Sequence, residues 1–161
     1  MHSKPYVLPW LTGGVSKAGG IGVRAKNEGH KLSNAGEDYL EAIYCVLLEH
    51  PGDNAVRSVD VSERLDVSKA SVNKALSALK EGGFVEQTRY GRVELTEEGR
   101  EYAARVWRRH RMLRSFLNHE LGVEEDVADE EACLMEHALS EDTTRRLMDY
   151  LERQGVAIDS E

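Results

Sequence analysis

The sequence predicts a mainly α-helical protein with one small β-hairpin, arranged as an N-terminal winged helix-turn-helix followed by a helical domain. Apolar residues recur at helical spacing through most of the chain after residue 33. Two short helical patterns follow each other across a brief turn, and two strand patterns come directly after them. The helical patterns then resume and continue almost to the C-terminus.

The first regular element is expected only after a glycine-rich segment. Residues 1–33 hold scattered basic residues and no sustained period, which predicts a flexible basic arm. A helix should begin near Ser33 or Asn34, either of which can cap it, and should end at His50-Pro51-Gly52. Its expected apolar stripe consists of Tyr39, Leu40, Ile43, Tyr44, Leu47 and Leu48.

The next patterns predict a helix-turn-helix and a wing. A short helix is expected around 59–65, a turn at Asp66-Val67, and a third helix capped by Ser68 and ended by Gly82-Gly83. The apolar face of that third helix consists of Val72, Ala75, Leu76 and Leu79. Strands over 84–87 and 92–95 should form a hairpin around Arg89-Tyr90-Gly91.

The second half of the chain predicts three further helices. Thr96 should cap a long one that reaches about residue 120, with Tyr102, Val106, Leu113, Phe116 and Leu117 on its buried side. Helices over 127–139 and 143–153 should follow, the last capped by Ser140. The predicted organisation is an arm (1–33), a winged helix-turn-helix domain (34–96), a linking helix (97–120) and a helical metal-binding and dimerisation domain (121–161).

Charge is unevenly distributed along this acidic chain, whose net charge is -8. Residues 56–115 carry thirteen Lys and Arg against nine Asp and Glu, whereas residues 116–161 carry three against fourteen. A basic middle can follow DNA phosphates, and an acid-rich end can hold hard cations or serve only as a solvated surface.

Composition also excludes several classes of protein. No apolar run approaches the ~18 residues that cross a membrane, and we see no secretory signal. The two cysteines, Cys45 and Cys133, are expected to be reduced thiols or ligands, as in a cytoplasmic protein.

The third helix is the expected recognition helix for DNA. Its apolar stripe faces inward, which leaves Lys69, Ser71, Asn73, Lys74 and Ser77 outside. Lys and Ser suit phosphates, while Asn and Lys suit base edges. The wing should add Arg89, Tyr90 and Arg92 at its tip. Any one of these residues could merely keep a helix soluble, so the prediction rests on the ensemble, and similar modules also mediate protein contacts.

Potential metal ligands share helical faces at three places. Asp38 and Glu41 are three residues apart, and His110 lies among arginines in the linking helix. Cys133, Glu136 and His137 stand at i, i+3 and i+4. By spacing alone each has an ordinary alternative: helix-terminal charges, an interior histidine, or a small core cysteine.

Several segments resemble the diphtheria-toxin-repressor and manganese-transport-regulator family. They are Glu37-Asp38-Tyr39-Leu40-Glu41-Ala42-Ile43-Tyr44, Val67-Ser68-Lys69-Ala70-Ser71-Val72, Leu95-Thr96-Glu97-Glu98-Gly99, Arg109-His110-Arg111 and Glu131-Ala132-Cys133-Leu134-Met135-Glu136-His137-Ala138-Leu139-Ser140. The resemblance covers roughly residues 34–153. It implies a winged-helix DNA domain, a helical dimerisation domain and metal bound between them, in the shorter, two-domain form that lacks an SH3-like third domain.

The resemblance also implies the metal ligands: Asp38, Glu41, His110, Cys133, Glu136 and His137. Asp38 and Glu41 match the manganese branch, whereas Cys133 matches the iron branch, where the manganese branch usually has Glu. Arg114 and Asp129 stand where the iron branch has the Glu and His of an ancillary site, so that site is not expected in its usual form. Mn²⁺ is the first choice and Fe²⁺ the second, although Zn²⁺ or Co²⁺ could bind more tightly in vitro.

The expected function is therefore a metal-dependent repressor of metal-uptake genes. A homodimer would bind a palindromic double-stranded operator, with no membrane and no small-molecule substrate as partner. The main alternative is a winged-helix regulator that does not sense metal. A metalloenzyme is the other alternative, but the sequence offers no separate acid/base constellation for one.

Overall fold

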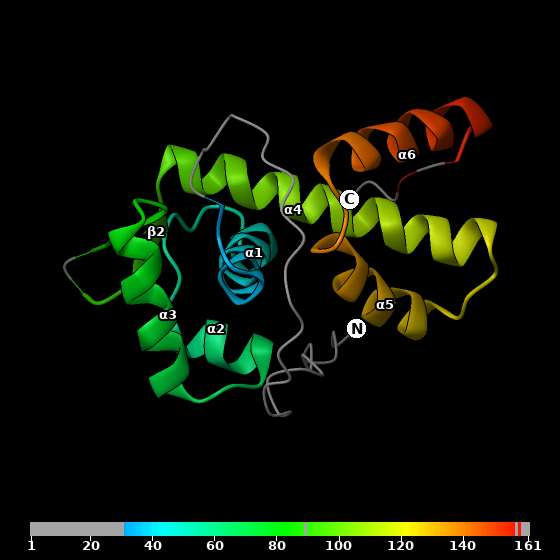
Figure 1. Cartoon of the computed structure of the whole chain (residues 1–161). Coiled ribbons are helices and arrows are strands. Elements are labelled where there is room, and N and C mark those ends of the chain that lie inside the picture. Colours follow the sequence, from blue (N-terminus) through cyan, green and yellow to red (C-terminus); the bar gives the residue numbers. More distant parts are fainter. Residues whose placement is uncertain (1–30, 89, 157, 159–161) are drawn as a thin grey trace, which may run out of the picture. The chain divides into compact units, whose positions relative to one another are not determined.

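The computed structural model describes residues 31–88, 90–156 and 158, so most of the expected N-terminal arm lies outside the described residues. The chain divides into two compact units, residues 1–100 (the first unit) and 101–161 (the second unit). The elements in chain order (Figure 1) are α1 (Asn34–Glu49), α2 (Ser58–Leu65), α3 (Lys69–Glu81), β1 (Val85–Gln87), β2 (Val93–Leu95), α4 (Glu97–Ser115), the π-helical turn η1 (Phe116–Glu120), α5 (Glu125–Glu136) and α6 (Glu141–Gln154).

Helix α1 begins where its cap predicts. The Ser33 hydroxyl oxygen accepts a hydrogen bond from the Gly36 amide at 3.2 Å, and the helix stops two residues before Pro51. Leu47 is buried as expected, but the inclusion of Leu48 in the buried stripe was wrong, because its side chain is 50% exposed. The buried face of this part of α1 consists instead of Ile43, Val46 and Leu47.

The turn between α2 and α3 has the geometry of a tight helix-turn-helix. Asp66 adopts the left-handed conformation (φ 50°), and Val67 donates its amide to the carbonyl of Ser62 at 3.1 Å. Ser68 then caps α3 by accepting from the Ser71 amide at 3.1 Å. The predicted cap and the predicted turn are both confirmed.

An aspartate fixes the start of α2. The Asp60 carboxylate accepts from the backbone amide of Arg57 at 3.0 Å and pairs with the guanidinium of the same residue. The hydrogen bond from the Arg57 side chain lowers the pKa of Asp60 below its ordinary value, against an opposing effect of burial. The α2 N-terminus is thus held by a charge that persists at neutral pH.

The wing is an antiparallel hairpin in which Val85 pairs with Leu95 and Gln87 with Val93. Each strand begins one residue later than expected, at Val85 and at Val93, and ends where it was expected to end. Val56 adds an isolated bridge to Val93, with mutual backbone hydrogen bonds of 2.9 and 2.8 Å. The segment before α2 therefore anchors the base of the wing.

A glycine lets the start of α4 lie against the start of the wing. Thr96 donates its amide to the carbonyl of Phe84 at 3.1 Å and its hydroxyl to the carbonyl of Gly83 at 2.7 Å. Its hydroxyl oxygen also accepts from the Gly99 amide at 3.0 Å, which is the predicted cap. A Cβ at Gly99 would lie 1.9 Å from the carbonyl oxygen of Phe84, so only glycine fits.

The expected single helix over 97–120 changes its hydrogen-bonding pattern near its end. It is α-helical to Ser115 and then π-helical, as shown by the bond from the Leu121 amide to the carbonyl of Phe116 at 3.3 Å. Gly122, with φ 69°, then turns the chain, and the side-chain amide of Asn118 donates to the carbonyl of Val123 at 2.8 Å. Local hydrophobic spacing does not distinguish these two helix types.

Helices α5 and α6 complete the second unit. The expected range 127–139 for α5 was displaced: the helix begins at Glu125, where acidic residues favour a helix N-terminus, and His137 is its C-terminal cap. Helix α6 begins directly after its predicted cap, Ser140, two residues before the expected start at 143, and ends at Gln154 with Gly155 as its C-terminal cap. The buried core of this unit consists of Met112, Leu113, Leu117, Ala128, Ala132 and Leu151.

No helix in the described part of the chain is both long enough and apolar enough to cross a lipid bilayer.

Substitution of Gly99 tests the contact between α4 and the wing. We expect Gly99→Ala to lower the free energy of unfolding by about 3 kcal/mol, because the new methyl group meets a backbone carbonyl that cannot move aside. Urea unfolding followed by circular dichroism measures this effect. Arg100→Ala, at the exposed neighbouring position, should change stability by at most about 0.5 kcal/mol. Equal stability of the two variants would contradict the assignment.

Candidate metal centre and DNA-binding surface

The outer face of α3 carries the side chains predicted to contact DNA. All five are exposed, while Val72 and Leu79 of the same helix are buried. The exposed set is Lys69, Ser71, Asn73, Lys74 and Ser77. The helix therefore presents a polar, basic surface without acidic residues in its first turn.

The hydroxyl groups on this face are partly engaged within the helix. Ser71 Oγ lies 2.9 Å from Ser68 Oγ, and the Ser77 hydroxyl donates to the carbonyl of Asn73 at 3.0 Å. The side chains of Lys69, Asn73 and Lys74 make no such contact within the described residues. These three have the greatest freedom to meet a phosphate or a base edge.

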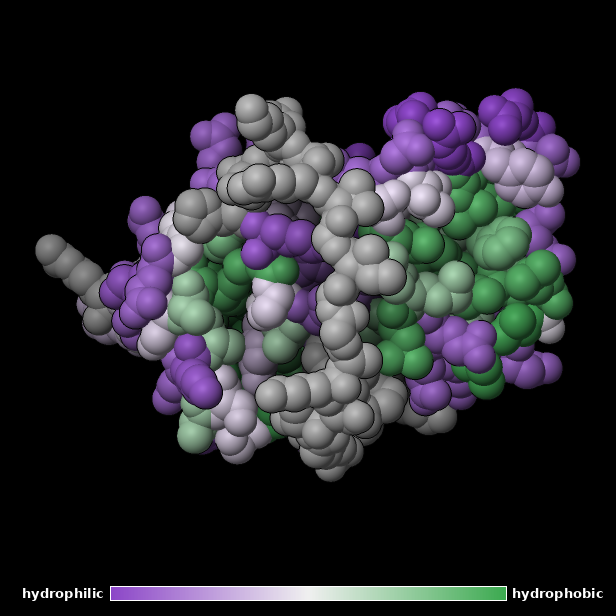
Figure 2. Space-filling view, viewed as in Figure 1, coloured by the Kyte–Doolittle hydropathy of each residue, from purple (hydrophilic) through white to green (hydrophobic). Residues whose placement is uncertain are grey.

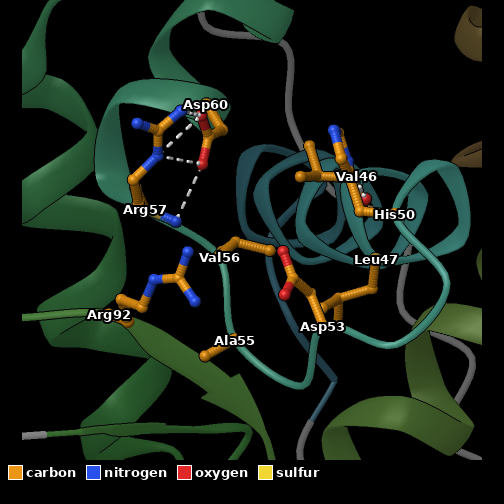
Figure 3. A pocket seen from close by; sticks show the side chains of 9 residues that line it. All are labelled: Val46, Leu47, His50, Asp53, Ala55, Val56, Arg57, Asp60 and Arg92. Atoms are coloured by element: carbon orange, nitrogen blue, oxygen red, sulfur yellow. Dashed lines mark hydrogen bonds and ion pairs between the residues drawn. The ribbon is translucent and has the colours of Figure 1, made fainter.

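The three wing residues predicted to contact DNA differ in their surroundings. Arg89 lies outside the described residues, and Tyr90 is 93% exposed beside it. Arg92 is half-buried and lines a hollow in the first unit, toward which its guanidinium points (Figure 3). Of the two predicted DNA contacts in the described part of the wing, Tyr90 is therefore the more exposed one.

That hollow is too small for a typical organic effector. It measures about 100 Å³ and is lined by Val46, Leu47, His50, Asp53, Ala55, Val56, Arg57, Asp60 and Arg92 (Figure 3). Pockets for drug-sized ligands are usually at least about 300 Å³. Its mixed acidic and basic lining also lacks a dominant charge, so we assign it no ligand.

Three of the predicted metal ligands lie around the carboxylate of a fourth, Glu136, in the second unit. The Glu136 carboxylate lies 3.2 Å from His110 Nδ1 and 3.4 Å from His137 Nε2. One ligand atom each of Cys133, Glu136 and His137 falls within 4.8 Å of the others. His137 keeps helical dihedral angles as the cap of α5, so the predicted i, i+3, i+4 face extends to the helix end.

The surroundings of Glu136 fit a bound cation. Its side chain is 0% exposed, and neither carboxylate oxygen accepts a hydrogen bond in the part of the chain that the structure describes. Burying a carboxylate without donors is costly unless a positive charge lies beside it. Imidazole, thiolate and carboxylate are also the groups that bind first-row transition metals.

The other two predicted ligands belong to the first unit. Asp38 and Glu41 are one turn apart on α1, where Asp38 is 3% exposed and Glu41 is half-buried. Burial raises the pKa of the Tyr39 hydroxyl above its ordinary value, and the negative charge of Asp38 raises it further.

Sequence reasoning missed two neighbours of His110. The Trp107 ring stacks on the imidazole, with centroids 5.7 Å apart and planes 3° apart. Asp129 Oδ1 lies 3.1 Å from His110 Nε2. The i, i+3 spacing of Trp107 and His110 was a usable signal, whereas nothing local linked His110 to a residue nineteen positions away.

Comparison with known families also divides the chain into a DNA-binding part and a metal-binding part. Residues 31–93 match the N-terminal DNA binding domain of the iron dependent repressor family, and residues 96–155 match its metal binding and dimerisation domain. The chain belongs to the iron-dependent repressor family. This family consists of DNA-binding transcriptional repressors rather than enzymes. The resemblance seen in the sequence is thereby confirmed.

Two curated relatives match most of the chain. The chain is 35% identical to the iron-dependent repressor IdeR of Mycobacterium tuberculosis over 122 residues, which cover 76% of this chain and 52% of IdeR. It is 32% identical to the transcriptional regulator MntR of Salmonella typhimurium over 136 residues, which cover 84% of this chain and 83% of MntR. The chain thus spans about half the length of IdeR and most of MntR.

A solved structure gives the same fold. A manganese-dependent transcriptional repressor in complex with manganese superposes with a TM-score of 0.65 and 33% identity, covering 73% of this chain and 52% of that one. The predicted fold class, a winged helix-turn-helix followed by a helical domain, is confirmed.

The metal-free protein should be strained by its buried carboxylate. We expect Glu136→Gln to raise the free energy of unfolding by about 1–2 kcal/mol in the presence of a chelator, because the substitution removes an uncompensated buried charge. Thermal and urea unfolding measure this change. Glu130→Gln, on the exposed side of α5, should have little effect. A destabilised Glu136→Gln protein would show that the carboxylate already has adequate partners.

Proposed function

We propose that this protein is a cytoplasmic, metal-dependent transcriptional repressor that binds operator DNA when Mn²⁺ or Fe²⁺ is bound. The observation that carries the proposal is Glu136, a fully buried carboxylate beside two imidazoles and a thiol. Such a group has a clear role in a cation site and none in an ordinary core.

The proposed ligands are Asp38, Glu41, His110, Cys133, Glu136 and His137. Helical spacing supports the pair on α1, Asp38 and Glu41, and the three ligands of α5. In the second unit, ligand atoms of Cys133 and His137 lie close to Glu136, and so does His110 Nδ1. When bound, the cation supplies positive charge that neutralises the carboxylates and joins α1 to the second unit. Without it, the proposed ligands of the two units are no longer joined by a shared ion.

This coupling connects metal to DNA through α1. Helix α1 packs against α2 and α3, so a constraint on α1 is also a constraint on the recognition helix. A dimer that reads two half-sites about 34 Å apart needs its two recognition helices held at a fixed separation. The metal centre raises DNA affinity by favouring the conformation in which that separation is correct.

An apolar face of the second unit is the proposed contact between protomers. Leu121, Val127 and Leu134 are exposed, and Val127 and Leu134 lie two turns apart on α5. Apolar side chains gather on the face of this unit seen in Figure 2. Exposed apolar patches of this kind mark interfaces, and the domain match includes dimerisation.

The donor set leaves two metals as candidates. Its carboxylates suit Mn²⁺, its imidazoles suit Fe²⁺, and the Cys133 thiolate favours the softer ion. The relatives include both an iron-dependent repressor and a manganese-dependent one. We place Mn²⁺ first because two of the carboxylates, Asp38 and Glu41, are close together on one helix face.

A DNA selection with and without metal tests the proposal. The full chain is incubated with randomised double-stranded DNA in Mn²⁺ or in chelator, and the enriched sites are measured by mobility shift. We expect a palindromic site whose affinity rises at least about tenfold with Mn²⁺, as coupling energies of 1–3 kcal/mol imply. The double variant Asp38→Ala/Glu136→Ala should fold and lose this response. Equal affinity in Mn²⁺ and chelator would overturn the proposal.

A second measurement tests the DNA surface independently. We expect Lys74→Ala to weaken binding to all sequences and to reduce the slope of log K against log salt by about 1, because one phosphate contact is lost. Lys80→Ala, exposed at the end of the same helix, is the matched control and should retain the full slope. Identical slopes for both variants and the wild type would exclude Lys74 from the interface.

A further inference from the structure

The His110 imidazole lies between two carboxylates of the second unit. Its Nδ1 is 3.2 Å from Glu136 Oε2, and its Nε2 is 3.1 Å from Asp129 Oδ1. The ring is almost completely buried, and both neighbours belong to α5. One helix therefore approaches both nitrogens of a single side chain on α4.

The two contacts are not equivalent. A neutral imidazole carries one N–H and one lone pair, and a carboxylate oxygen can only accept. The geometry from His110 Nε2 to Asp129 is that of a hydrogen bond, whereas neither oxygen of Glu136 accepts one in the described part of the chain. The proton accordingly belongs on Nε2, and the lone pair of Nδ1 faces Glu136.

Asp129 is itself held in place by a neighbouring charge. Arg114 Nε lies 3.6 Å from the same oxygen, Asp129 Oδ1, and the Arg114 guanidinium also pairs with Glu125. The guanidinium thus connects the first turn of α5 to the aspartate one turn later. This ion pair holds the aspartate oxygen in place beside the ring.

Trp107 fixes the remaining freedom of the imidazole. The indole is parallel to the imidazole within 3°, so rotation of the histidine ring would disrupt the stack. The Arg111 guanidinium lies over the Trp107 ring, 5.7 Å from its centroid. The plane of the ring is set by Trp107 and its direction by Asp129.

We propose that Asp129, supported by Arg114, is a positioning residue that selects the His110 tautomer protonated on Nε2 and aims the unprotonated Nδ1 at the proposed cation. The identity of the cation site rests on the proposed function, but the tautomer is a property of the metal-free protein. Partners of ligating histidines typically account for 10–100-fold in metal affinity.

The first test needs no metal. Long-range ¹H–¹⁵N spectra of the full chain in chelator report which ring nitrogen of His110 carries the proton, and His110→Gln assigns the signal. We expect Nε2–H in the wild type and a mixture of tautomers in Asp129→Ala. Asp129→Asn keeps an accepting oxygen and the side-chain size, so it should retain the wild-type tautomer. A proton on Nδ1 in the wild type would overturn the proposal.

The second test measures Mn²⁺ affinity by calorimetry on the same proteins. Asp129→Ala should bind about tenfold or more weakly, Asp129→Asn should recover most of this loss, and Glu130→Ala should match the wild type. Glu130→Ala is the matched control because this substitution removes one exposed carboxylate from the same helix. Wild-type affinity in Asp129→Ala would overturn the positioning role. Unchanged Mn²⁺ binding in Glu136→Ala would instead overturn the metal centre, a result that the Asp129 variants cannot mimic.

Discussion

The buried carboxylate of Glu136 is the constraint on which the second unit depends. Its helix is packed by Ala128 and Ala132, whose small side chains allow α5 to approach its neighbours closely. The same packing removes Glu136 from water without giving its oxygens a hydrogen-bond donor in the described part of the chain. Such a core reaches its full stability only when a positive charge lies beside Glu136. Cation binding and the free energy of unfolding are therefore linked.

The first unit combines a buried apolar core with backbone contacts that join its elements. Thr96, Gly99 and the carbonyl of Phe84 join α4 to the wing, while Val56 ties the wing to the segment before α2. These contacts hold the recognition helix without using any residue of its outer face. The polar outer face of α3 therefore stays available for the proposed DNA contact, and the hollow of about 100 Å³ in the same unit is too small for a typical organic effector.

Much of this organisation could be predicted from short-range sequence signals. Ser33, Ser68 and Ser140 each cap the helix that they were expected to cap, since capping depends on residues three positions apart. The helical ligand face Cys133-Glu136-His137 was predictable for the same reason. The errors had other causes: Leu48 continues an apolar run but points away from the core, and α5 is displaced because its acidic first turn is as favourable as its apolar stripe. The pairing of His110 with Asp129 depends on how α4 and α5 pack, which no local pattern encodes.

The π-helical turn at the end of α4 has a consequence for comparisons between sequences. A turn of this kind holds one more residue than an α-helical turn, so it is geometrically equivalent to a one-residue insertion absorbed without a loop. Each added residue rotates the following side chains by about 100° around the axis. A relative whose helix is α throughout this segment therefore requires a single-position gap between Ser115 and Gly122, and an ungapped pairing would match inward-facing residues with outward-facing ones.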